Sequence, residues 1–151
     1  RGVRLAFHHH MGTVVQTEAE VDRLMAETTD DVGLLLDTGH LVFAGGDPVS
    51  VARRHAERIV HVHCKDVRRA VEGYFFTPLG QGQVGCECIL DAVARTSLDL
   101  SIEIPLRLHR QANAQPSRAP YRVPIADIET VLRSALALVH ESLDTSLAQT
   151  T

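Results

Sequence analysis

The chain has 151 residues, of which 44% are hydrophobic and 23% are charged, and its formal net charge is −4. This composition is typical of a globular protein large enough to bury a hydrophobic core. A mildly acidic chain with Lys65 as its only lysine and no basic cluster argues against a nucleic-acid-binding face, and no apolar run reaches the length of a membrane span.

The cysteines and the start of the chain bear on its cellular context. Cys64, Cys86 and Cys88 form no CxxC pair and are odd in number, so we expect no disulfide framework and a cytoplasmic location. The chain opens at Arg1, without an initiator Met or a signal-peptide pattern. We therefore expect a fragment of a longer protein.

Apolar runs and capping residues predict strands that alternate with helices. In chain order we expect a strand at 3–7, a helix after 17, a strand at 32–36, a helix from 47 to about 57, a strand at 58–63, a loop at 67–85, a helix at 86–96, a strand ending near 103, an irregular segment at 105–124, and an amphipathic helix that starts near 124 and frays after about 143. Thr17 and Glu20 form a capping box, and Asp47-Pro48 is a helix start.

This alternation is typical of a parallel sheet built from βα units. Four such units predict either a doubly wound sheet or part of a barrel. No shift in composition marks a domain boundary, so residues 1–151 are predicted to form a single domain.

Side chains able to bind a metal follow each predicted strand at its carboxyl end. They are His8, His9 and His10 after the first strand, Asp37 and His40 after the second, His61 and His63 with Lys65 on the third, and Glu103 on the fourth. The carboxyl ends of parallel strands are where active sites form, so we expect these groups to converge on one point. A mixed nitrogen and oxygen set suits a divalent ion such as Mn²⁺, Co²⁺, Fe²⁺ or Zn²⁺.

Taken singly, these residues have simpler explanations. A strand-end histidine such as His40 is usually a surface or hydrogen-bonding residue, and an Asp before Thr-Gly can cap a turn. Lys65 can equally form an ordinary salt bridge with Asp66. Four strand ends that each carry a candidate ligand favour a metal site over these explanations.

Three segments carry a resemblance to a known family: HHHMGTVVQTEAEVDRLM, GLLLDTGHLVFAGGDP and RIVHVHCKDV. They resemble the inosose dehydratases, in the sugar phosphate isomerase/epimerase superfamily of xylose isomerase-like TIM barrels. The resemblance implies that this chain is the C-terminal half of a (β/α)8 barrel, strands five to eight. It also implies a small-molecule substrate of the polyol or sugar class.

The resemblance assigns roles by position. The ligands of one divalent ion become His8, Asp37, His63 and Glu103, with Mn²⁺ or Co²⁺ favoured and Zn²⁺, Fe²⁺ or Mg²⁺ as alternatives. His9, His10, His40 and His61 become substrate contacts, and Glu103, His40 and Lys65 become the acid–base candidates. His8 stands where the epimerases of the superfamily carry a Glu that serves as ligand and base.

The expected reaction is therefore the metal-dependent dehydration of an inosose, 2-keto-myo-inositol, by removal of the α-proton and loss of the β-hydroxyl. Losing one of two carboxylate bases argues against epimerisation, although a sugar or hydroxypyruvate isomerase or epimerase is the nearest alternative. A half-barrel without catalytic activity is the other. Such a piece has two open sheet edges, so we expect it to form a homo-oligomer or to aggregate.

Overall fold

The computed structural model describes residues 4–71, 73–94, 96, 98–103 and 125–148. Its centre is a parallel sheet of four strands in the order β1-β2-β3-β6. The strands are β1 (Leu5–His8), β2 (Val32–Asp37), β3 (Ile59–Cys64) and β6 (Asp99–Ile102). Four parallel strands in sequential order confirm the predicted βα architecture.

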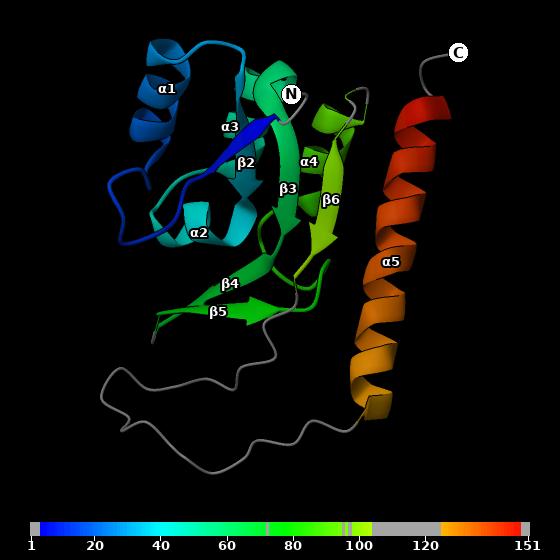
Figure 1. Cartoon of the computed structure of the whole chain (residues 1–151). Helices are drawn as coiled ribbons and strands as arrows, with labels where there is room; N and C mark the ends of the chain where they lie inside the picture. Colours follow the sequence, from blue (N-terminus) through cyan, green and yellow to red (C-terminus); the bar gives the residue numbers. More distant parts are fainter. Residues whose placement is uncertain (1–3, 72, 95, 97, 104–124, 149–151) are drawn as a thin grey trace.

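The helices of the described part of the chain lie between the strands, except for α5, which follows β6. They are α1 (Glu18–Glu27), α2 (Thr38–Phe43), α3 (Pro48–His55), the short 3-10 helix η1 (Ala56–Arg58), α4 (Cys86–Val93) and α5 (Ile125–Ala148). Figure 1 shows α3 and α4 behind the sheet, and α5 packs against α4. Leu34, Leu36 and Val62 are completely buried in the core, as expected for apolar strands beneath helices.

The predicted helix starts are confirmed. The Thr17 hydroxyl accepts the Glu20 N–H while the Glu20 carboxylate accepts the Thr17 N–H, which completes the capping box of α1. The Asp47 carboxylate accepts the Val49 N–H ahead of Pro48 in α3.

The predicted loop at 67–85 is partly wrong. Its first part forms an antiparallel hairpin of β4 (Asp66–Ala70) and β5 (Gly73–Thr77), which pair Val67 with Phe76. The run Tyr74-Phe75-Phe76-Thr77 has high strand propensity, so the signal was present in the sequence. The adjacent Arg68-Arg69 pair interrupts the apolar alternation that would have identified the partner strand.

The C-terminal helix is longer than predicted. Although fraying was expected after Leu143, α5 continues to Ala148. The hydroxyls of Ser142, Thr145 and Ser146 donate to the carbonyls four residues earlier, which accommodates these polar residues within the helix. The predicted irregular segment 105–124 lies outside the described residues.

An irregularity between β2 and β3 sets which side chains face the open side of the sheet. Leu34 pairs with Ile59 and Leu35 pairs with His61, so one extra residue, Val60, is accommodated in β3. Beyond it, His61 and His63 lie on the same side, with their ring centroids 5.1 Å apart. No helix in the described part of the chain is long and apolar enough to span a membrane.

Candidate metal and active site

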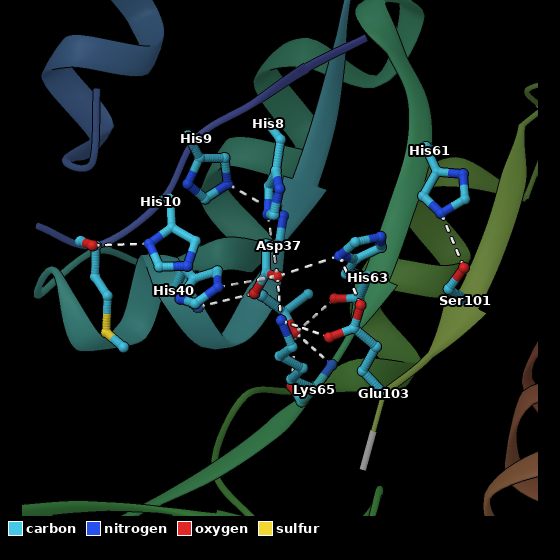
Figure 2. A network of polar contacts seen from close by, with 12 residues as sticks. His8, His9, His10, Asp37, His40, His61, His63, Lys65, Ser101 and Glu103 are labelled. Atoms are coloured by element: carbon cyan, nitrogen blue, oxygen red, sulfur yellow. Dashed lines mark hydrogen bonds and ion pairs between the residues drawn. The ribbon is translucent and has the colours of Figure 1, made fainter. Parts of the chain in front are cut away.

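The candidate site lies where the carboxyl ends of the four parallel strands meet. β1 ends at His8, β2 ends at Asp37, β3 carries His63 near its end, and Glu103 follows β6 directly. The Glu103 N–H donates to the Cys64 carbonyl at 3.0 Å, which extends the pairing of β6 with β3. The sheet therefore brings these four side chains to one edge (Figure 2).

One carboxylate oxygen, Oδ2 of Asp37, is the centre of the cluster. It lies 3.3 Å from His8 Nε2, 3.6 Å from His40 Nε2 and 3.4 Å from His63 Nδ1. The Asp37 side chain has no exposed surface. Three imidazoles thus surround a single buried carboxylate oxygen.

Lys65 and Glu103 complete the cluster on its other side. Lys65 Nζ donates to Asp37 Oδ2 and lies 2.7 Å from Glu103 Oε2. The other oxygen of Glu103, Oε1, lies 2.9 Å from His63 Nδ1. The alternative pairing of Lys65 with Asp66 does not occur, because the Asp66 carboxylate accepts the backbone N–H groups of Val67, Gly80, Gly82 and Val84.

The backbone around Asp37 fixes its carboxylate. Asp37 is the N-cap of α2, and its Oδ1 accepts the His40 N–H at 2.9 Å. His40 therefore lies on a helix, not on the strand end at which the sequence placed it. A helix start at this point holds the carboxylate in place and favours its negative charge.

His9 supports Asp37 from behind. Its side chain is completely buried, and its Nε2 accepts the Asp37 N–H at 3.1 Å. This position corrects the prediction that His9 contacts substrate, because a ring with no exposed surface holds the Asp37 backbone instead. Spacing alone does not reveal which of three successive imidazoles turns inward.

His10 and His61 differ in their distance from the cluster. The His10 ring lies 3.5 Å from the His40 ring, and its Nδ1 contacts the Met11 carbonyl at 2.8 Å. His61 lies deeper along the strand, where Nε2 contacts Ser101 Oγ at 3.0 Å (Figure 2). His10 is thus beside the Asp37 cluster and His61 is not.

Thr38 is a site residue that the sequence analysis missed. Its hydroxyl donates to the Lys65 carbonyl at 2.6 Å and accepts the Lys65 N–H at 2.8 Å. These bonds tie the start of α2 to the end of β3. The signal was the position of Thr38 directly after Asp37, but its partner is 27 residues away in sequence and depends on strand order.

Burial and charge determine the protonation of the cluster. Burial lowers the pKa of His9 and of His40 to about 4, and it also lowers the pKa of His8. Burial acts to raise the pKa of Asp37, but hydrogen bonds from Lys65 and the His40 N–H outweigh it and the pKa falls. At neutral pH these imidazoles are neutral and Asp37 is ionised, which are the forms that bind metals.

Among the residues that the structure describes, two groups of three have the spacing required to hold a metal ion. Asp37, His63 and Glu103 form one group, and His8, Asp37 and His40 form the other; within each, the ligand atoms lie within 4.8 Å of one another. The four ligands expected from the sequence are thus divided between two groups that share Asp37. His40 joins the second group, although the sequence analysis assigned it to substrate and acid–base work.

Comparison with known proteins places the chain in a family. The family model described as xylose isomerase-like TIM barrel matches residues 1–122. The chain belongs to the xylose isomerase-like TIM barrel family. The predicted fold class, part of a (β/α)8 barrel, is therefore confirmed.

Individual relatives agree with the family. The chain is 53% identical over 111 residues to the rhizopine catabolism protein MocC of Rhizobium meliloti, a match that covers 63% of this chain and 34% of that protein. It is 41% identical over 114 residues to the inosose dehydratase of Lacticaseibacillus casei, covering 65% of this chain and 38% of that protein. The matched segments thus make up little more than a third of either relative.

A solved structure shows the same fold over almost the whole chain. The crystal structure of IOLI protein with a binding zinc atom superimposes with a TM-score of 0.58 at 17% identity. The superposition covers 95% of this chain and 49% of the other. The chain therefore spans about half the length of that structure.

Proposed function

We propose that this chain carries the metal-binding half of a dehydratase that acts on a cyclic keto-polyol, 2-keto-myo-inositol. The main support for this proposal is the cluster at the strand ends. Ligand atoms of Asp37, His63 and Glu103 lie within 4.8 Å of one another, and Lys65 contacts both carboxylates. The relatives named inosose dehydratase support this reaction and substrate. The reaction class is a lyase, specifically a hydro-lyase.

The residues present fit a divalent ion. His8, Asp37, His63 and Glu103 would hold it, and they offer two imidazoles and two carboxylates, a donor set that suits Mn²⁺, Co²⁺, Fe²⁺ or Zn²⁺ better than Mg²⁺. Among the described residues, buried His63 Nδ1 has no hydrogen-bond partner, although it lies near both carboxylates. A bound ion would act as a Lewis acid that polarises the substrate carbonyl and acidifies the adjacent C–H.

The side chains of this chain can then move the two protons of the elimination. Glu103 takes the α-proton, the C–H electron pair forms the new C=C bond, and the β C–O bond breaks. The departing hydroxyl takes a proton from the Lys65 ammonium and leaves as water. Lys65 Nζ lies 2.7 Å from Glu103 Oε2, so the proton held by Glu103 can return to Lys65, and the net change is loss of one water.

The remaining histidines fit substrate contacts. His40 and His10 stack beside the cluster and can donate to or accept from polyol hydroxyls. His8 in place of a second carboxylate leaves one strong base beside the ion, which suits elimination better than the two-base inversion of an epimerase. His61 lies farther from the cluster and is the weaker candidate for substrate contact.

A turnover assay tests the proposal. The chain is incubated with 2-keto-myo-inositol with and without Mn²⁺ or Co²⁺, alone and with the remaining half of a relative's barrel, and dione absorbance is followed. We expect metal-dependent dione formation that Glu103→Gln lowers by roughly 100-fold or more, as for loss of a general base. Glu87→Gln, at an exposed carboxylate on α4, is the matched control.

The other outcomes separate the alternatives. Exchange of the α-proton into deuterated water without dione formation supports a sugar isomerase or epimerase. Bound metal with neither reaction supports a half-barrel without catalytic activity. Either result would contradict the dehydratase proposal.

A further inference from the structure

Lys65 occupies a carboxylate oxygen that the proposed ion needs, Asp37 Oδ2. Its Nζ donates to Asp37 Oδ2 and pairs with Glu103 Oε2. Asp37 Oδ1 already accepts the His40 N–H at 2.9 Å, so Oδ2 is the oxygen left for a further ligand. An ammonium and a divalent ion that meet at one buried oxygen repel each other strongly.

We propose that Lys65 and the divalent ion compete for Asp37 Oδ2. Lys65 is the internal cation of the ion-free site, and it leaves this oxygen when an ion binds. The inference rests on the proposed metal function, because it concerns the same ligands. It adds a role that metal coordination alone does not assign to Lys65.

The need for an internal cation follows from the burial of Asp37. An ionised carboxylate with no exposed surface requires a compensating charge. Lys65, itself only 5% exposed, supplies it.

The structure limits where the displaced ammonium can go. Both backbone polar groups of Lys65 are bound by Thr38. A Cβ on Gly39 would lie 3.0 Å from Lys65 Cβ and Cδ and 2.8 Å from the Phe76 ring, so the aliphatic stem is closely packed on this side. Only the end of the side chain is free to move, and Glu103, whose side chain is 39% exposed, remains within its reach.

The consequence is that metal binding prepares Lys65 for its proposed role. While it is bound to Asp37 Oδ2, the ammonium is engaged on the buried side of the cluster. Once displaced, it stays near Glu103, whose side chain is partly exposed. Lys65 is then available as a proton donor only in the ion-loaded site.

Lys65 is the only lysine in the chain, which makes its amine easy to follow. We would acetylate the 151-residue chain briefly with and without saturating Co²⁺ and measure the Lys65 product by mass spectrometry, relative to the amino-terminal amine. Competition predicts that Co²⁺ raises this ratio by roughly fivefold or more, because Lys65 loses its buried partner. An unchanged or lowered ratio with Co²⁺ bound overturns the proposal.

The affinity of the chain for Co²⁺ gives a second test, in which competition and support by Lys65 predict changes in opposite directions. If Lys65 competes, Lys65→Met should bind Co²⁺ roughly tenfold more tightly, as measured by the visible absorption of bound Co²⁺. If Lys65 only supports the ligands, the variant should bind more weakly, which would contradict competition. Arg53→Met, at an exposed arginine on α3, removes the same charge away from the site and controls for net charge.

The acetylation and Co²⁺-binding experiments also distinguish failure of this inference from failure of the proposed function. Absence of Co²⁺ binding by the unsubstituted chain overturns both the metal function and the competition. Co²⁺ binding with an unchanged Lys65 ratio overturns the competition alone. The labelling arm uses the unsubstituted chain, so it decides the matter even if Lys65→Met fails to fold.

Discussion

Burial sets the protonation of the imidazole that supports Asp37, and this makes the stability of the chain depend on pH. His9 is completely buried, and burial lowers its pKa to about 4 from 6.5. Between these values the unfolded chain binds a proton that the folded chain does not, so the free energy of unfolding decreases as the pH falls from 6.5 to 4. The full shift corresponds to a loss of up to about 3 kcal/mol.

Replacing this imidazole should flatten the pH dependence. In His9→Gln the amide oxygen can still accept the Asp37 N–H, but the side chain no longer titrates. Urea unfolding in EDTA at several pH values should therefore show a smaller loss of stability between pH 6.5 and 4 than in the unsubstituted chain. The exposed His140→Gln is the control, and an unchanged slope in His9→Gln would show that His9 does not cause the effect.

The sequence predicted which residues converge better than it predicted what each one does. His8, Asp37, His63 and Glu103 follow strands, and parallel strands place their carboxyl ends together whatever the loops do. His9 and His40 depend on the direction in which the chain turns after a strand. That direction is set by the burial of one ring and by the helix that Asp37 caps, neither of which spacing alone reveals.

Among the secondary-structure elements, the turn between α1 and β2 depends on one arginine. Arg58 in η1 donates to the carbonyls of Met25, Thr29 and Val32 at 3.1, 2.8 and 2.8 Å. These groups include the last turn of α1, whose carbonyls have no partner within the helix. The planar guanidinium bonds to several acceptors at once, which a lysine cannot reproduce.

We therefore expect Arg58→Lys to lower the free energy of unfolding by about 1–3 kcal/mol, the usual effect of leaving partly buried acceptors unpaired. Urea unfolding monitored by circular dichroism measures this change. Arg53→Lys, at an exposed position on the neighbouring helix α3, should change stability by less than about 0.5 kcal/mol. An equal change in the free energy of unfolding in the two variants would rule out a special role for the hydrogen bonds of the Arg58 guanidinium.

The elements that the sequence missed share a physical cause. α2 follows β2 without any intervening loop, so the apolar run of the strand merges with the helix that Asp37 caps. The β4–β5 hairpin is stabilised by contacts from elsewhere in the chain: Phe43 on α2 lies 5.1 Å from Phe76 and 5.3 Å from Tyr74, ring centroid to centroid. The strand propensity of residues 74–77 indicates one strand of the hairpin, but the tertiary contacts that hold both strands in place are not visible in a window of sequence.

In the molecule as a whole, β1 and β6 each pair with one neighbour among the described strands, which leaves two open edges. Exposed apolar side chains lie on β1 and on α5: Leu5 is 61% exposed, and Leu132 and Leu136 are 46% and 48% exposed. α5 packs against α4 (Figure 1). Unpaired parallel edges and flanking apolar surface favour association.

We accordingly expect the 151-residue chain to self-associate through these edges, and sedimentation velocity should show an average mass that rises with concentration. Introducing charge on the α5 surface with Leu132→Glu and Leu136→Glu should shift the chain toward monomer, because a buried carboxylate without a partner is costly at an interface. Leu147→Glu, which changes a leucine that is 54% exposed near the end of the same helix, should have a smaller effect.

Because the parallel edges can pair only with strands, the remaining half of a relative's barrel should compete with self-association. A chain that stays monomeric at every concentration, or a Leu147→Glu variant that dissociates as fully as the double variant, would contradict an interface at these edges.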